Sequence, residues 1–149
     1  MSERSELVRR YLQSLPHDIK DVYADLSIRD DLVEKLRPSI EENFFITLVG
    51  PPGSGFEERH DGVEGFLSGW QDWTDPYETY LFELGDIEEI GNAVLTHGRQ
   101  TATLPGGAEV IDMPDIISVW WFHGDLITSI EFHLDADLAL ERARSQAAG

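Results

Sequence analysis

The segment "DIISVWWFHGDLITSIEFH", residues 115–133, decides the fold class because it reads as two strands joined by a turn. β-Branched and aromatic residues dominate both halves, and "HGD" at 123–125 has the composition of a tight turn between antiparallel strands. Successive side chains of a strand point to opposite faces of its sheet. Both halves are apolar on both faces, so each face of this hairpin needs a cover.

Alternation divides the side chains of the hairpin between two faces. We assign its polar groups, Ser118, Glu131 and His133, to the concave face, together with Trp120. The convex face then carries a set of purely apolar residues: Ile117, Val119, Trp121, Ile130 and Phe132. A second subunit is the economical cover for such a face, so we expect a homodimer. The alternative cover is another helix of the same chain, either the third or the C-terminal one.

The rest of the chain predicts helices first and antiparallel strands afterwards. Apolar residues have helical spacing over the first forty or so residues, and "FFITLV" at 44–49 reads as the first strand. Asp61 and Glu64 have the spacing of a capping box before a helix that ends at Pro76. From there the period changes to two, in strands expected at 77–90, 92–104, 108–123 and 126–135, before a short helix at 136–146. This order is typical of an α+β domain.

Composition limits the partners of the protein. The chain has 149 residues, which favours a single domain over residues 1–149, and a formal net charge of −18. Nucleic acid and anionic membranes are therefore not expected as partners. No apolar stretch approaches the ~20 residues of a membrane span, so a cytoplasmic location is expected. The chain has no cysteine, and its five histidines show no metal-ligand spacing, so we expect neither a metal nor a cofactor.

A glycine-rich loop follows the first predicted strand and resembles a nucleotide-binding P-loop. Gly50 and Gly55 fit the spacing G-x-x-x-x-G. Phe56 stands where the phosphate-binding lysine belongs, and Glu57 replaces the hydroxyl residue that would hold magnesium. We therefore expect no nucleotide here, and interpret residues 50–62 as a loop at the rim of the sheet.

Three stretches, taken in order, resemble the SnoaL-like polyketide cyclases, which belong to the nuclear transport factor 2 and ketosteroid isomerase superfamily. The stretches are "RHDGVEGFLSGWQDW" (59–73), "GNAVLTHGRQTATLPGGAEV" (91–110) and "DIISVWWFHGDLITSIEFHLDADLALERA" (115–143). The resemblance covers the chain from Arg59 onward. It implies a cone-shaped roll, in which N-terminal helices pack on the concave face of a curved, mainly antiparallel sheet around a pocket. Many members of the superfamily also form dimers through the convex face.

The resemblance argues against steroid-isomerase chemistry. Ser118 aligns with the aspartic acid of the isomerases, and Ile46, Thr47 and Leu48 stand where their base would be. The remaining catalytic candidates are Glu131 and His133, with Ser118 beside them. A carboxyl group buried among apolar side chains has a raised pKa and can act as a general acid or base, and a histidine can be its partner. The alternative is that both groups are merely solvated at the open end of the cone.

Other residues are candidates for the lining of the pocket. Tyr11 matches the tyrosine of the isomerases loosely, and the tryptophans are either flat pocket walls or core. His97 and Arg99 bind an acidic or carbonyl group if they point inward, and are surface residues if they point outward. Phe56 would reach over the mouth as part of a lid. The full set is Tyr11, Phe56, Trp70, Trp73, Tyr77, His97, Arg99 and Trp120.

Two functions remain open at this point. The first is cofactor-independent acid–base chemistry, such as isomerisation, cyclisation or hydration, on an apolar ligand that contains rings or an enolisable group. The alternative is a ligand-binding protein or dimeric interaction module without enzymatic activity. The fold does not decide between them, because it serves enzymes and binding proteins alike.

Overall fold

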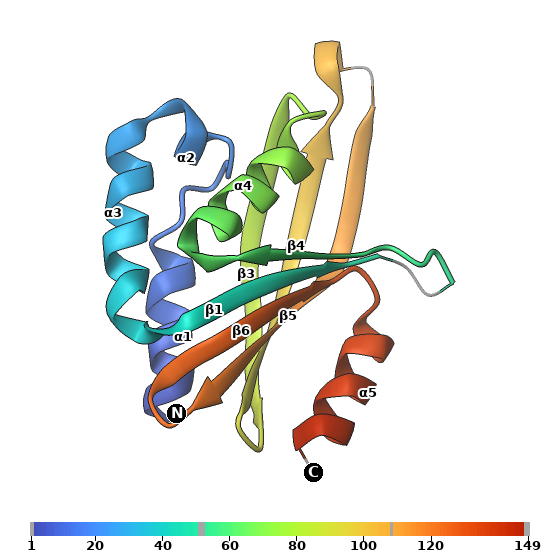
Figure 1. The fold of residues 1–149 in the computed structure, drawn as a ribbon. Coiled ribbons are helices and arrows are strands. Elements are labelled where there is room, and N and C mark those ends of the chain that lie inside the picture. The colour runs from blue at the N-terminus through green and yellow to red at the C-terminus, as the bar shows by residue number, and fades with distance from the viewer. Residues whose placement is uncertain (1, 51–52, 108, 148–149) are drawn as a thin grey trace.

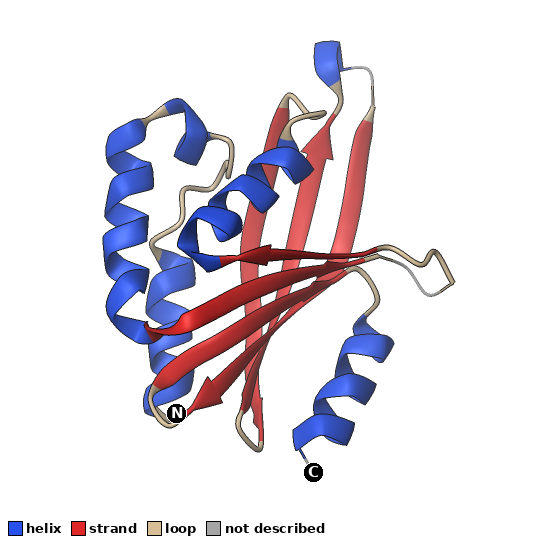
Figure 2. Cartoon of the chain, in the orientation of Figure 1, coloured by secondary structure: helices blue, strands red, loops and turns tan. Residues whose placement is uncertain are grey.

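The predicted hairpin forms β5 (Val110–His123) and β6 (Leu126–His133) at the centre of a curved sheet (Figure 1). The structure is a computed structural model, and it describes residues 2–50, 53–107 and 109–147. Gly124 supplies the turn of the hairpin with a φ of 61°, which favours a residue without a Cβ atom. The chain has the predicted α+β architecture, with helices on both sides of the sheet (Figure 2).

Six strands make up the sheet, in the order β2-β1-β6-β5-β4-β3. Only the pair of β1 and β6 is parallel among the described strand pairs, and the others are antiparallel. The strands outside the hairpin are β1 (Ile40–Val49), β2 (Glu57–Asp61), β3 (Thr79–Ile90) and β4 (Ala93–Thr103). The mainly antiparallel sheet predicted from the sequence is thus confirmed.

The segment around the P-loop-like sequence differs from the prediction. β1 starts at Ile40 because a short 3-10 turn at Arg37–Ser39 ends the helical region earlier than expected. Residues 57–61, predicted as loop, form β2 and pair antiparallel with β1. Pro51 and Pro52 lie outside the described residues. The following helix starts without the predicted capping box, because the carboxylate of Asp61 binds Arg59 at 2.8 Å instead of a backbone N–H group.

Four helices cover the concave face of the sheet (Figure 1). They are α1 (Glu3–Gln13), α2 (Asp21–Ala24), α3 (Leu26–Leu36) and α4 (Gly62–Thr74). Their buried apolar side chains pack against Phe44 and Ile46 of β1 and Trp120 of β5 in one continuous core. No helix among the described residues is both long and apolar enough to span a bilayer.

Part of the convex face is covered by α5 (Ala136–Ala147). Ala139 and Ala143 are fully buried there, and they pack against a cluster that includes Ile117, Val119 and Trp121. For these three residues the alternative considered from the sequence, a cover by the C-terminal helix, is the correct one. The predicted homodimer itself stays a prediction.

The assignment of Ile130 and Phe132 to the convex face is wrong. Ile130 pairs with Trp120, and Phe132 pairs with Ser118. Directly opposed residues of an antiparallel pair point to the same side of the sheet. Both side chains therefore belong to the concave core under the N-terminal helices.

The two edges of the sheet are β2 and β3. Both carry exposed acidic side chains, Glu57, Glu58 and Asp61 on β2 and Glu83, Asp86, Glu88 and Glu89 on β3. Acidic side chains thus lie along both edges. The edge of β3 is also partly covered, because the backbone N–H of Phe82 donates to the carbonyl oxygen of His17 and that of Ile19 donates to the carbonyl oxygen of Tyr80.

The contact between α5 and the sheet predicts a stability effect. Replacing Ala139 by Leu adds atoms where the helix already touches the sheet, and overpacking of this kind costs about 1–3 kcal/mol. We expect Ala139→Leu to lower the free energy of unfolding by that amount in chemical denaturation. Ser145→Leu, at an exposed position of the same helix, should change it little. Equal effects of the two substitutions would contradict the packing described for α5.

Candidate ligand-binding site

A cavity lies between the N-terminal helices and the concave face of the sheet. Its volume is about 690 Å³ counted out to its mouth. Its walls are mostly apolar and aromatic side chains, which suit a largely apolar molecule with flat rings. The lining residues are Tyr11, Leu12, Leu15, Ile19, Val22, Tyr23, Leu32, Phe66, Leu67, Trp70, Phe82, Thr96, Gln100, Ile116, Ser118, Trp120 and Phe132.

The polar groups in this lining are all uncharged. They are two phenols, two aliphatic hydroxyls, two indole N–H groups and one carboxamide, whereas no Asp, Glu, His, Lys or Arg is among the described lining residues. Ligand pockets commonly combine apolar walls with a few placed polar groups. This cavity can therefore offer hydrogen bonds to a ligand, but no ion pair from a described lining residue.

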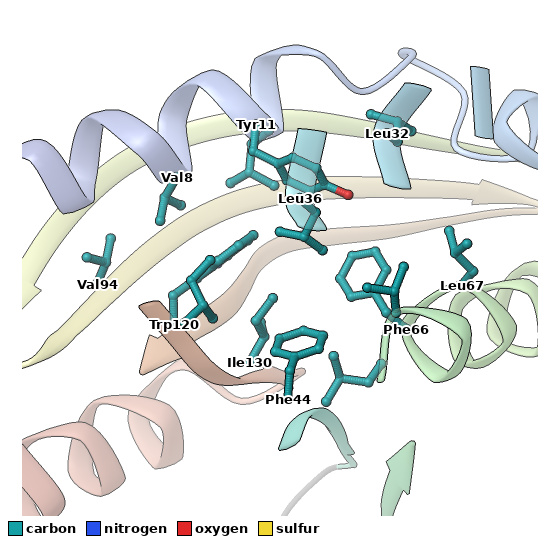
Figure 3. Close-up of a cluster of buried hydrophobic side chains, with 14 of the residues drawn as sticks. Val8, Tyr11, Leu32, Leu36, Phe44, Phe66, Leu67, Val94, Trp120 and Ile130 are labelled. Carbon is teal, nitrogen blue, oxygen red and sulfur yellow. The ribbon is translucent and has the colours of Figure 1, made fainter. Parts of the chain in front are cut away.

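Aromatic rings form the walls of the cavity. Tyr11 of α1 meets Phe66 of α4 and Trp120 of β5 edge to face, with ring centroids 6.5 and 6.0 Å apart. Figure 3 shows these three side chains among the buried apolar residues. Trp70 of α4 meets Phe132 of β6 at 4.9 Å. Tyr11, Trp70 and Trp120, predicted as pocket residues, thus line the cavity while also packing with the core.

The phenol of Tyr11 is held in its neutral form. Burial raises the pKa of Tyr11 well above its ordinary value, because an ionised phenol loses solvation inside the protein. Its hydroxyl makes no hydrogen bond to a described residue. Tyr11 is therefore a free hydrogen-bond donor in the cavity wall, and it does not act as a base near neutral pH.

Two short chains of hydrogen bonds reach the cavity, the first beginning on α4 and the second lying within the sheet. In the first, the indole N–H of Trp73 donates to the hydroxyl of Tyr80 at 2.8 Å, and Tyr80 donates to Oε1 of Gln100. In the second, the indole N–H of Trp120 donates to Oγ of Ser118 at 2.8 Å. The hydroxyl groups of Ser118 and Thr96 form a hydrogen bond with each other. Each chain thus ends at a polar group that borders the cavity.

A second, smaller cavity adjoins the first. Its volume is about 270 Å³, and it shares Trp70, Gln100, Ile116 and Phe132 with the main cavity. Trp73 borders this second space and not the main one. Gln100 therefore stands at the junction of the two spaces.

Glu131 and His133 do not share a face with Ser118, contrary to the prediction. Glu131 pairs with Val119, and His133 pairs with Ile117. Both side chains therefore point to the convex side, away from the main cavity. The reason is the register of the hairpin, which sets which residue of β6 stands opposite Ser118.

Glu131 and His133 nevertheless form a pair. Nε2 of His133 lies 3.0 Å from Oε1 of Glu131, and the imidazole is fully buried. Nδ1 of His133 is also buried and has no hydrogen-bond partner among the described residues. His133 borders the smaller cavity, but its Nδ1 atom is not accessible to water.

His97 and Arg99 lie on the outer face of β4, so the outward alternative of the two considered is the correct one. His97 lies between Asp115 at 3.1 Å and Glu88 at 3.4 Å. Arg99 makes a bidentate ion pair with Asp112. Neither side chain borders the main cavity. The predicted role of His97 and Arg99 as ligand-binding residues of that cavity is therefore wrong.

The remaining pocket candidates lie outside the main cavity. Phe56 is exposed and packs against Trp73, with ring centroids 6.4 Å apart, and its role as part of a lid stays a prediction. Tyr77 packs against Tyr80, and its carbonyl oxygen accepts a hydrogen bond from Lys20. Neither is among the residues that line the cavity.

Sequence reasoning missed Thr96 and Gln100. They lie on β4 on either side of His97 and Arg99, and their side chains reach the inner face. The sequence did contain a signal for them. Val94, Thr96, Gln100 and Ala102 stand at alternate positions of one strand, and the apolar Val94 and Ala102 indicate that this side of the strand faces the core. The prediction instead chose the charged residues between them, His97 and Arg99, as ligand-binding residues.

Comparisons with known proteins identify the fold. No protein-family model and no curated protein sequence matches the chain. Among solved structures, an NTF2-like protein of unknown function from Burkholderia pseudomallei superposes with a TM-score of 0.62 at 13% identity, over 95% of this chain and 97% of that one.

Two further solved structures superpose over nearly their whole length. A candidate SnoaL-like polyketide cyclase from Jannaschia sp. CCS1 gives a TM-score of 0.60 at 13% identity, covering 97% and 96% of the two chains. A candidate polyketide cyclase from Acidithiobacillus ferrooxidans gives 0.57 at 18% identity, covering 98% and 96%. At such identities the likeness shows the fold, and the fold expected from the sequence resemblance is confirmed.

The wall of the cavity predicts a steric effect at Gly98. A Cβ atom at this position would lie 2.8 Å from Cε2 of Phe82, which is too close. Gly98→Ala should push the Phe82 ring into the cavity and lower the free energy of unfolding by about 1–3 kcal/mol. Chemical denaturation measures the loss. Restored stability in the double variant Gly98→Ala with Phe82→Leu would confirm the contact, whereas a fully stable single variant would contradict it.

The environment of His97 predicts a pH dependence of stability. Partial burial alone would lower the pKa of His97, but hydrogen bonds to Asp115 and Glu88 and their negative charges outweigh it and raise the pKa. A pKa raised in the folded state adds stability below the unfolded value of about 6.5, and this contribution is lost as the pH rises through the folded pKa. His97→Gln should therefore cost more stability at pH 5.5 than at pH 9.

Thermal unfolding across this pH range measures the difference for His97. The size is expected to stay below about 1 kcal/mol, because the site is near the surface. His17→Gln, at an exposed histidine, is the control for the loss of a histidine as such. A cost that is the same at both pH values would show that the imidazolium adds no stability.

Proposed function

We propose that this chain, which has the NTF2-like fold, binds an uncharged, largely apolar molecule with one or two flat rings in the cavity under its N-terminal helices. The observation that carries this proposal is the lining, which combines aromatic and aliphatic walls with neutral hydrogen-bonding groups. The aromatic rings of Tyr11, Trp70 and Trp120 in its walls support a flat ligand. Candidate polyketide cyclases among the similar structures support a ligand that contains rings.

Electrostatics support a neutral ligand. Burying an ionised group without a charged partner is costly, and the described lining residues supply no such partner. The formal net charge of −18 would also repel an anion on its way to the cavity. An uncharged ligand avoids both costs.

Proton transfer by Glu131 and His133 is not part of this proposal. The two side chains lie on the convex side of the sheet, and the neutral Tyr11 is no base near neutral pH. Hydrogen-bond donors alone can polarise a carbonyl group or stabilise an enolate. Removal of a carbon-bound proton also needs a base, and the described lining offers none. Ligand binding without acid–base catalysis is therefore the better supported of the two functions.

Binding of 2-methylnaphthalene tests the proposal. The four tryptophans of the chain give four indole N–H signals in a ¹⁵N-resolved NMR spectrum. We expect the Trp120 and Trp70 signals to shift on titration, because both rings line the cavity. Trp121, under α5 on the other face, should shift least. 2-Naphthoate, which has a similar shape but carries a negative charge, should bind at least about tenfold more weakly.

Three variants locate the binding site. Ile116→Phe fills the cavity from β5 and should weaken binding of 2-methylnaphthalene at least about tenfold, because a filled pocket excludes the ring. Val110→Phe makes a similar change at an exposed position of the same strand and should leave binding unchanged. Glu131→Gln should also leave it unchanged. Equal affinity in Ile116→Phe and the original protein would contradict binding in this cavity.

A further inference from the structure

We propose that Gln100 makes the cavity selective for ligands that carry a hydrogen-bond acceptor of the carbonyl type, and that Trp73 and Tyr80 set this selectivity by orienting its carboxamide. The inference rests on the proposed function, since it concerns the ligand of the same cavity. It concerns which polar group of an otherwise apolar ring compound is recognised.

The direction of the hydrogen bonds starts at Trp73. An indole N–H group is a donor only, and it lies 2.8 Å from the hydroxyl oxygen of Tyr80. That oxygen must therefore accept, and the hydroxyl hydrogen of Tyr80 remains to be donated elsewhere. Tyr80 is completely buried, so leaving this hydrogen without an acceptor would be costly.

Gln100 supplies the acceptor. Its Oε1 atom receives the hydrogen bond from Tyr80. The reverse orientation of the carboxamide would place a second donor group against Tyr80 and leave the phenolic hydrogen unpaired. The donor-only character of Trp73 thus fixes the orientation of an amide two hydrogen bonds away.

The chain of hydrogen bonds from Trp73 through Tyr80 therefore ends at Gln100, whose side-chain N–H groups remain available to a ligand. Nε2 makes no hydrogen bond to a described residue, and Gln100 borders both cavities. Its backbone is held between two neighbouring strands, opposite Phe82 on β3 and Met113 on β5. A donor that is fixed in this way loses little conformational freedom when a ligand binds.

The second chain of hydrogen bonds is less suited to this task. Ser118 and Thr96 bond to each other, and Ser118 also accepts from Trp120. One hydroxyl hydrogen of the pair is left over, whichever group donates. Because a hydroxyl rotates freely, this pair can act as donor or acceptor toward a ligand. It therefore tolerates both kinds of ligand, whereas the unpartnered group of Gln100 is its Nε2 amide, which only donates.

The consequence is a preference among ligands of equal shape. A carbonyl oxygen placed against Gln100 accepts one of its N–H groups. A ligand with only carbon at that position covers the donors without replacing their hydrogen bonds, which sites of this kind reject. For one neutral hydrogen bond we expect a preference of about three- to tenfold.

Two isosteric probes measure this preference. 2-Acetylnaphthalene has a carbonyl oxygen where 2-isopropenylnaphthalene has a methylene group, and the two are otherwise alike in shape. Their dissociation constants are measured by quenching of tryptophan fluorescence, with the tryptophan indole N–H signals of the NMR spectrum as the check on location. The expected result is tighter binding of the ketone by about three- to tenfold.

Variants assign the preference to Gln100 and its partners. Gln100→Met, which keeps a similar length without the amide, should bring the ratio of the two constants close to one, and Gln100→Leu is the second variant if that protein does not fold. Tyr80→Phe frees the carboxamide to rotate and should lower the ratio although Gln100 is present. Ser118→Ala should keep the ratio, and Gln71→Leu, at an exposed glutamine of α4, is the surface control.

The possible failures are distinguishable. If neither probe binds the original protein, the proposed function falls and this inference with it. If both bind equally, the proposed function stands and the selectivity by Gln100 is overturned. If the ratio falls in Ser118→Ala and not in Gln100→Met, the hydroxyl groups of Ser118 and Thr96 bind the carbonyl oxygen of the ligand, and the role given to Gln100 is wrong. A ratio unchanged in Tyr80→Phe overturns the role given to the orienting pair.

Discussion

The alternation of side chains along β5 is the constraint on which the two layers of the protein depend. Trp120 and Trp121 are neighbours in the chain, yet each is buried in a different core, the first under the N-terminal helices and the second under α5. A slip of one residue would exchange every such side chain between the layers. The central strand thus couples the cavity on one face to the cover on the other, because both are built from one alternating sequence.

The strands and helices were predictable because their signals are local. Alternation from residue 77 onward and helical spacing before it gave elements close to those of the structure, and the resemblance of three motifs gave the cone-shaped fold. β2 escaped prediction because "EERHD" is polar on both sides. Such a segment is a strand only through its hydrogen bonds to β1, and nothing within it indicates that partner. The cover of Ile117 by α5 was likewise one of two alternatives that local patterns leave open.

The polar site was less predictable because it depends on register between strands. Each strand of the hairpin is apolar on both faces, so hydrophobicity does not decide whether Glu131 or Phe132 stands on the same side as Ser118. The irregularity between Trp121 and Phe122 changes the phase within the hairpin, as a bulge does. Gln100 was missed for a related reason. Its carboxamide is oriented by hydrogen bonds through Tyr80 and Trp73, and no spacing along the sequence indicates that these three residues meet.

The acidic edges of the sheet have a consequence for how copies of the protein meet. An exposed edge strand offers unpaired backbone groups to any other strand, and natural sheets guard such edges with charge. When two copies approach edge to edge through β2 or β3, two chains that each carry a formal net charge of −18 meet, and like charges repel. This repulsion weakens as salt screens it. Resistance to sheet-to-sheet aggregation is therefore a property that the ionic strength of the surroundings tunes.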